Sequence, residues 1–284
     1  SAETVGRGRV HCFPSTNLPL PSPAMFLSTS VAGVVYFNQV NIPPLPSGDW
    51  LRLRDGPSLL EELHDTTRAG DLASVGGTVW PAAATLCTWM RAHAEDVEGA
   101  SVLELGSGTG ACGLYAAALG ASRVVLTDGR EGLRPLQDDN IRRNAPLIRA
   151  GTRVTSETLA WGFAPPPAGP WDLVIGSDLI YDSQAELAIT LATLLEATPP
   201  PTVLLAHEHR QRRYASDGSF DGRWDEDDED LSGFIAAAHD ERGLQLEQLA
   251  WELPTAAARM GGEREISIIQ VSGDRDQQSQ RGRR

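Results

Sequence analysis

Val102-Leu103-Glu104-Leu105-Gly106-Ser107-Gly108-Thr109-Gly110 is the stretch that decides the fold of this chain. An apolar run with a single acid enters a glycine-rich turn, and small residues typical of a helix follow over 111–119. Strand, glycine turn and helix in this order open a nucleotide-binding βαβ unit, where glycines permit a tight turn and a close approach of ligand to backbone. Glu104 is unusual, because a carboxylate inside a buried strand is costly without a partner.

Apolar runs typical of strands alternate with helical patterns along the rest of the chain. We expect strands at 122–128, 152–159, 171–178 and 202–207, and helices at 82–93, 133–144, 185–196 and 230–242. Two late strands, at 244–253 and 265–271, have no helix between them, and such strands are usually antiparallel. The sequence therefore predicts an α/β fold with one mostly parallel sheet, helices on both faces and an antiparallel last strand.

The N-terminal part has a different composition. We divide the chain into a flexible lead-in at 1–33, an N-terminal extension at 34–75, a main domain at 76–273 and a disordered tail at 274–284. Segments 34–40 and 50–54 flank a proline-rich turn and predict a β-hairpin, and 59–64 predicts a short helix. Residues 4–48 lack Asp and Glu, as organelle transit peptides do, but show no arginine-rich amphipathic helix.

Composition excludes several classes of protein. Hydrophobic residues make up 41% of the 284 residues, enough for a packed core, and no run approaches the roughly 18 apolar residues of a membrane span. The net charge of -14 argues against broad nucleic-acid binding and suits a basic partner. Three distant cysteines, at 12, 87 and 112, predict neither a disulfide framework nor a metal site. We expect a monomer in the cytoplasm, with the nucleus or an organelle left open.

Two acids mark the ends of predicted strands. Asp128 lies twenty residues beyond Gly108, where nucleoside-binding folds place the carboxylate that accepts hydrogen bonds from ribose. Asp178 ends the strand at 171–178, and ligands of open α/β sheets bind at the carboxyl ends of strands, where the strand order reverses. The glycines do not follow the dinucleotide pattern G-x-G-x-x-G. The absence of lysine excludes a P-loop and a pyridoxal Schiff base.

These residues carry a family resemblance. The glycine stretch, Asp128 and 171–178 resemble class I S-adenosylmethionine-dependent methyltransferases, which have a Rossmann-like seven-stranded sheet. More specifically, the chain resembles family-16 protein-lysine methyltransferases, the group that contains the methyltransferase-like 21 enzymes. Four motifs carry this resemblance: Gly77-Thr78-Val79-Trp80-Pro81, Val124 to Asp128, Leu159-Ala160-Trp161-Gly162 and Asp178-Leu179-Ile180-Tyr181.

The resemblance implies a cofactor, S-adenosyl-L-methionine, and a set of site residues. Eight positions would bind the cofactor: Trp80, Glu104, Gly106, Ser107, Gly108, Asp128, Trp161 and Ser177. Glu104 would orient the turn or the cofactor's ammonium, and Asp178 and Tyr181 would face the substrate amine as the catalytic pair. A cation with a sulfonium and an ammonium favours acids and aromatic faces, which agrees with these residue types.

The implied reaction is N-methylation of a lysine side chain in a protein substrate. The alternatives are methylation of a small molecule or a protein histidine, and a catalytically inactive protein that binds the cofactor as a partner, because fold does not determine substrate. The acidic run at 225–230 is either a solvated loop or an electrostatic guide for a basic substrate. His207-Glu208-His209 places both imidazoles on one face of a strand, but no third ligand is evident, so we expect no metal site. One of the two histidines could instead line the substrate pocket, because the carboxyl end of the strand at 202–207 is nearby.

Overall fold

The computed structural model describes residues 42–63, 75–209, 228–249 and 266–273. The predicted lead-in, the strand at 34–40, Cys12 and the tail lie outside the described residues. So do residues 225–227 of the acidic run. None of the helices in the described ranges is long and apolar enough to cross a membrane.

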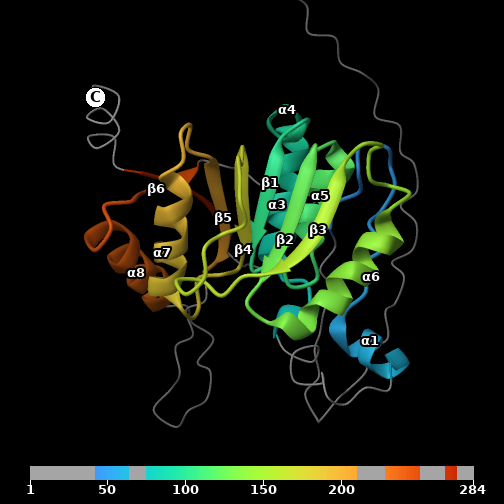
Figure 1. Ribbon diagram of the computed structural model, residues 1–284, viewed down its shortest axis with the longest axis horizontal. Coiled ribbons are helices and arrows are strands. Elements are labelled where there is room, and N and C mark those ends of the chain that lie inside the picture. The colour runs from blue at the N-terminus through green and yellow to red at the C-terminus, as the bar shows by residue number, and fades with distance from the viewer. Residues whose placement is uncertain (1–41, 64–74, 210–227, 250–265, 274–284) are drawn as a thin grey trace, which may run out of the picture.

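A seven-stranded sheet in the order β3-β2-β1-β4-β5-β7-β6 forms the centre of the molecule (Figure 1). Its strands are β1 Ser101–Leu105, β2 Arg123–Asp128, β3 Arg153–Thr158, β4 Leu173–Ser177, β5 Thr202–Glu208, β6 Gln245–Leu249 and β7 Ile266–Ser272. Strands β1 to β5 pair in parallel, whereas β7 runs antiparallel to both β5 and β6. This confirms the predicted α/β sheet and its antiparallel last strand, and it places the reversal of strand order between β1 and β4.

Helices pack on both faces of this sheet. They are α1 Gly56–Leu63, α3 Pro81–Ala92, α4 Ala94–Val97, α5 Ala111–Leu119, α6 Arg134–Asn144, α7 Gln184–Leu195 and α8 Glu229–Ile235, with short 3-10 turns at Val75–Gly77 and Glu131–Leu133 and a π-helical turn at Ala236–Asp240. One apolar core lies between the sheet and α3 and α5, and a second lies between the sheet and α7 and α8 (Figure 1). Strand β4 is buried on both faces, which explains its continuous apolar sequence.

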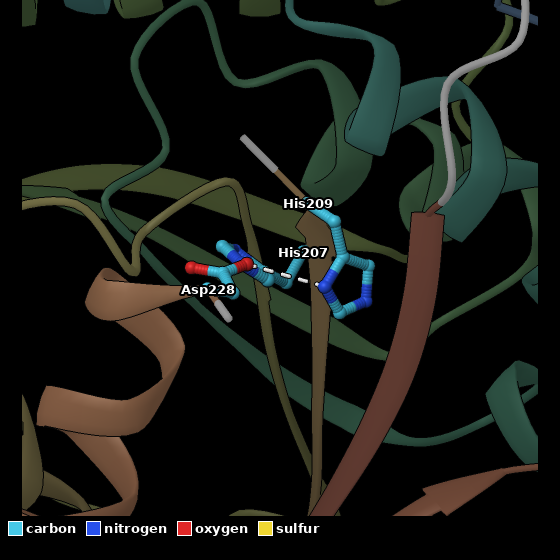
Figure 2. Close-up of side chains that lie close together, drawn as sticks. All are labelled: His207, His209 and Asp228. Carbon is cyan, nitrogen blue, oxygen red and sulfur yellow. Dashed lines mark hydrogen bonds and ion pairs between the residues drawn. The ribbon is translucent and has the colours of Figure 1, made fainter. Parts of the chain in front are cut away.

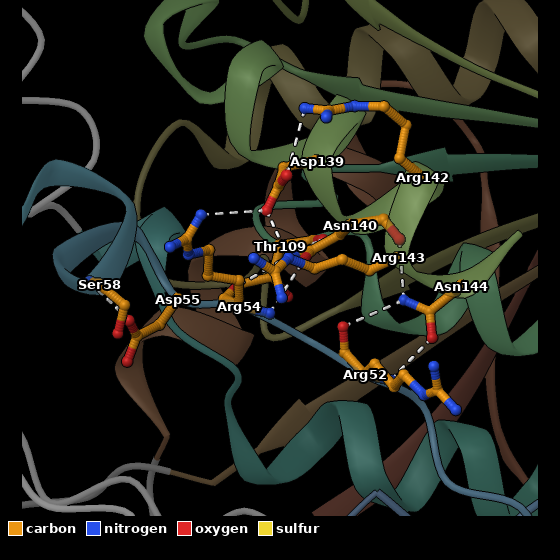
Figure 3. A network of polar contacts seen from close by, with 10 residues as sticks. All are labelled: Arg52, Arg54, Asp55, Ser58, Thr109, Asp139, Asn140, Arg142, Arg143 and Asn144. Carbon is orange, nitrogen blue, oxygen red and sulfur yellow. Dashed lines mark hydrogen bonds and ion pairs between the residues drawn. The ribbon is translucent and has the colours of Figure 1, made fainter. Parts of the chain in front are cut away.

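The predicted β-hairpin is wrong for its second arm, because residues 50–54 belong to no strand. Their backbone is bonded instead to two asparagine side chains of α6 (Figure 3). Asn144 Oδ1 accepts from the Arg52 N–H at 2.7 Å, and Asn140 Oδ1 accepts from the Arg54 N–H at 2.7 Å. Both amide nitrogens donate back, to the Arg52 carbonyl at 3.3 Å and to the Arg54 carbonyl at 3.0 Å. The apolar-charged alternation that predicts a strand therefore reflects an extended segment that packs on a helix.

The acidic run is only partly a loop. Asp228 is buried and caps the N-terminus of α8, because its Oδ1 accepts from the Leu231 N–H at 3.0 Å. Asp230 lies within the first turn of α8 and accepts from Gln184 at 3.3 Å. The reading of the run as a solvated loop is therefore wrong for its last three residues.

Candidate active site

A cavity of about 370 Å³ opens at the carboxyl ends of β1, β2 and β4, beside the reversal of strand order. Parallel α/β sheets bind ligands at this edge. The structure brings together here all ten residues that the sequence singled out: Trp80, Glu104, Gly106, Ser107, Gly108, Asp128, Trp161, Ser177, Asp178 and Tyr181. Their individual roles remain predictions, and their arrangement indicates what each can do.

The glycine turn presents bare backbone to the cavity. Gly108 has φ +51°, and a Cβ atom there would lie 2.6 Å from the backbone oxygen of Gly76, closer than real contacts allow. Gly106 also has a positive φ, and a Cβ atom there would collide with Leu179 and press on the indole of Trp161. A side chain at position 108 would displace backbone, and both glycines, which line the cavity, expose main chain there because they carry no side chain.

Glu104 has the partner that the sequence did not reveal. Its side chain is 2% exposed, and Oε2 accepts from the Gly113 N–H at 2.8 Å. Burial raises the pKa of Glu104 to about 8, although this hydrogen bond from the first turn of α5 favours the ionised form. The carboxyl group is therefore bonded to the helix that follows the turn, and it also lines the cavity, where a cation could stabilise its charge. Its role in orienting the turn or a cofactor ammonium stays a prediction.

Asp128 links the end of β2 to the glycine turn. Its Oδ2 accepts from the Gly108 N–H at 3.0 Å, and Oδ1 accepts from the Arg130 N–H at 3.0 Å. The side chain lines the cavity and is only partly buried, so both oxygens can accept further hydrogen bonds from a ligand.

Two indoles lie on the cavity wall. Trp80 precedes α3 and donates its Nε1–H to the Val75 carbonyl at 2.9 Å, which holds the ring in place. Trp161 follows β3, and its buried Nε1 has no hydrogen-bond partner among the described residues. A buried donor without an acceptor is costly, so a ligand acceptor in the cavity would relieve a cost here.

Asp178 occupies the end of β4 in a conformation that is uncommon for a side chain other than glycine. Its φ is +60°, its N–H donates to the Ala206 carbonyl at 2.7 Å, and the residue is 5% exposed. Such backbone outliers are concentrated at functional sites. Ser177 borders the same cavity, and Tyr181 is 46% exposed at its mouth. Burial raises the pKa of Tyr181, and the negative charge of Asp128 raises it further, so the phenol stays neutral.

Sequence reasoning missed the side chains that hold the turn from behind. Gln137 is fully buried and donates to the Ser107 hydroxyl at 2.9 Å and to the Gly108 carbonyl at 3.3 Å. Asn140 donates to the Thr109 carbonyl at 2.9 Å. One feature of the sequence could have predicted these supports: residues 137, 140 and 144 are polar, although they share one helix face where an apolar stripe is expected.

Three further residues of the cavity wall were not predicted from the sequence. Asp182 and Glu186 add carboxylates near the start of α7, and Phe163 is 84% exposed. The two acids lie four residues apart, the spacing that places side chains on one side of a helix start.

Comparison with known proteins identifies the family. A family model described as lysine methyltransferase matches residues 62–220, more than half of the chain. The chain belongs to the lysine methyltransferase family. The match includes β1 to β5, the glycine turn and all ten site residues.

Individual relatives of this family member match a smaller part of the chain. EEF1A lysine methyltransferase 3 from Mus musculus is 35% identical over 52% of this chain and 62% of its own length. Protein N-lysine methyltransferase METTL21A from Danio rerio is 38% identical over 46% of this chain and 59% of its own length. The chain therefore spans about three fifths of these relatives. A ribosomal protein L11 methylase from Lactobacillus delbrueckii subsp. bulgaricus, 13% identical, aligns with 69% of this chain and 80% of its own, with a TM-score of 0.45.

Proposed function

We propose that this protein transfers a methyl group from S-adenosyl-L-methionine to a lysine side chain of a protein substrate. The observation that supports this most is the composition of the cavity. Two acids, two indoles and the bare glycine turn converge at the reversal of strand order, beside a buried aspartate. Membership of the lysine methyltransferase family supports the same reaction.

The cavity residues fit this cofactor by charge and shape. The cofactor supplies an activated methyl group on a sulfonium. Glu104 would pair with its ammonium and Asp128 would accept hydrogen bonds from its ribose, while Trp80 and Trp161 offer flat apolar faces. The glycine turn, whose Gly106 and Gly108 line the cavity without side chains, would admit it close to the main chain.

Asp178 would dock the lysine ammonium and align it before its proton is lost. Free lysine has a pKa near about 10.4, so the amine must be deprotonated before it can react. Desolvation in the cavity and a nearby sulfonium both favour the neutral amine, whereas a carboxylate favours the ammonium. We therefore assign Asp178 to binding and orientation, and Tyr181 to the wall that limits how the amine can turn. Alignment and exclusion of water would supply most of the acceleration.

Electrostatics favour a basic protein segment as the substrate. Five acidic side chains line the cavity against one arginine: Glu104, Asp128, Asp178, Asp182 and Glu186, with Arg130. Because burial raises the pKa of Glu104 to about 8, the other four carry the charge near neutral pH unless a cation pairs with Glu104. The whole chain has a net charge of -14. Such a field would steer a cationic segment to the mouth, and added salt would then raise the KM for the protein substrate while leaving kcat nearly unchanged.

Labelled cofactor incubated with the purified protein and a cell lysate tests the proposal. We expect label in protein bands, and mass spectrometry to place it on lysine. Label in small molecules or on histidine would support the alternative enzyme functions, and tight cofactor binding without transfer would support an inactive partner. Because the chain contains no lysine, label on the enzyme itself could not be lysine methylation.

Asp178→Asn sharpens this test. Asparagine tolerates a positive φ, so the variant removes the charge without the backbone strain that alanine would add. We expect kcat/KM to fall by about 100-fold, a typical loss for a group that positions a reactant, with cofactor affinity within about threefold of wild type. Asp240→Asn, an exposed change outside the cavity, is the matched control. Activity near wild type in Asp178→Asn would contradict the assigned role.

We further propose that the protein acts as a monomer in a reducing compartment, the cytoplasm or nucleus. The buried, free thiols of Cys87 and Cys112 support this compartment. Sedimentation of the purified chain and fractionation of cells that express it would test both points.

A further inference from the structure

Three potential metal ligands converge between the end of β5 and the start of α8 (Figure 2). His207 Nε2 lies 2.8 Å from Asp228 Oδ2, and His209 Nδ1 lies 3.1 Å from the same oxygen. The three ligand atoms all lie within 4.8 Å of one another. None of these residues lines the cavity described above, so the cluster is separate from the proposed active site. The sequence showed no third ligand because Asp228 follows His209 only after 19 residues.

Neighbouring groups orient two of the three ligands, His209 and Asp228. Ser267 of β7 lies 2.8 Å from His209 Nε2, so its hydroxyl can accept the Nε2 proton and leave the Nδ1 lone pair directed at the cluster. Asp228 uses Oδ1 to cap α8 and keeps Oδ2 for the two imidazoles. The side chains of His207 and Asp228 are 1% and 6% exposed, and that of His209 is 20% exposed. Metal-binding histidines are commonly oriented by such an outer partner.

We propose that His207, His209 and Asp228 bind a divalent transition-metal ion, and that Zn²⁺ fits the site best. Two imidazoles and one carboxylate are a frequent ligand set for Zn²⁺, which binds nitrogen and oxygen ligands at about 2.0–2.2 Å. Tetrahedral geometry at these bond lengths places ligand atoms about 3.3 Å apart. The pairs at 2.8 and 3.1 Å need to separate by only a few tenths of an ångström to admit the ion. Water would supply the fourth ligand of a tetrahedral ion, because the cluster offers three.

The ion would join two parts of the chain that the sheet alone does not connect. His209 and Asp228 are the residues that flank segment 210–227, so one metal ion would fix both ends of this long connection. It would also tie α8 to β5, whose Ala206 carbonyl accepts the hydrogen bond from Asp178. The ion would therefore stabilise the folded chain, since a ligand that binds only the folded state stabilises it to an extent set by its affinity and concentration.

The test uses the full chain without a histidine tag, freed of metal by a chelator. Zn²⁺ binding is measured by calorimetry and elemental analysis, thermal unfolding is recorded with and without Zn²⁺, and Co²⁺ reports ligand geometry by its visible spectrum. We expect one ion per chain and a melting temperature raised by about 5 °C at a hundredfold excess over Kd, reversed by chelator. The Co²⁺ spectrum should have the intensity of a tetrahedral site.

Two variants make the assignment specific. His209→Ala removes a partly exposed ligand, and Asp228→Asn removes the charge while asparagine still caps α8. Both should lower Zn²⁺ affinity by at least about tenfold and reduce the thermal shift at the same Zn²⁺ concentration to about half or less. His239→Ala, which removes an exposed histidine paired with Asp240, should leave both unchanged. If Zn²⁺ does not bind or stabilise the wild type, or if folded His209→Ala binds it equally well, the proposal is overturned.

Discussion

The affinity for S-adenosyl-L-methionine should depend on pH through Glu104. Its pKa of about 8 in the free protein means that the protonated form exceeds the ionised form by about 100 to 1 near pH 6 and about 10 to 1 near pH 7. A cofactor ammonium requires the ionised form. If the bound carboxylate is fully ionised, Kd falls about ninefold from about pH 6 to about pH 7, and nearly one proton is released on binding.

The window from pH 6 to 7 isolates this carboxyl group. An α-amino group titrates near about 7.7–8.0, so the cofactor ammonium stays mostly protonated there. Because the folded pKa of Glu104 lies above its ordinary 4.5, its contribution to stability is fully present below about pH 4.5 and is lost as the pH rises through about 8. The cofactor would return part of this lost stability, so its stabilising effect on thermal unfolding should also grow with pH.

Calorimetry in buffers with different ionisation enthalpies measures both Kd and the protons released. In Glu104→Gln, the side-chain oxygen can still accept from the Gly113 N–H, but there is no charge to form. We expect weaker binding with no pH dependence across the window. Glu247→Gln, an exposed change on β6 at the far edge of the sheet, should behave as wild type. The reasoning would be refuted if the wild-type Kd changes less than about twofold between about pH 6 and about pH 7. It would also be refuted if the Kd of Glu104→Gln depends on pH as the wild-type Kd does.

Three further predictions follow from single contacts. Gly108→Ala should lower cofactor affinity by more than about tenfold in calorimetry, whereas Gly243→Ala, with a similar φ of +68° but open space around it, should show only the strain cost of about 1–3 kcal/mol in unfolding. Asn144→Ala leaves both backbone groups of Arg52 without their partner, so the free energy of unfolding should fall by about 1–3 kcal/mol in urea titrations. Tyr181→Phe should keep most of the methyltransferase activity because it preserves the ring that forms the wall, and Tyr181→Ala should lose it in the same assay.

The sequence predicted the elements whose signals are local. The helix at 111–119 matches α5 residue for residue, because glycines in left-handed conformations stand at both of its ends, at 110 and 120. The position of the candidate site at this edge of the sheet was predicted from one glycine turn and from acids at the ends of two strands. These features depend on neighbours within a few residues, which a single sequence displays.

The parts that the sequence missed depend on partners far along the chain. Gln137 supports the glycine turn across 30 residues, and Asp228 meets His207 across 21. The alternation over 50–54 is the same whether the backbone pairs with a strand or with side-chain amides. Only the fold decides between these, because α6 presents Asn140 and Asn144 at the spacing of one helical turn against the extended segment.

Asn140 connects the glycine turn to the N-terminal extension through direct hydrogen bonds. Its amide nitrogen donates both to the Thr109 carbonyl and to the Arg54 carbonyl, and its oxygen accepts from the Arg54 N–H. The side chain is fully buried, so each of these bonds would be expensive to lose. Burial alone would raise the pKa of Asp139 on the same helix, but the guanidinium groups of Arg143, Arg54 and Arg142 hold this pKa below its ordinary value. The carboxylate is therefore charged, and its ion pair with Arg54 also binds the extension to α6 (Figure 3). We therefore expect movement of the extension to shift the turn, and a ligand that orders the turn to order the extension in return.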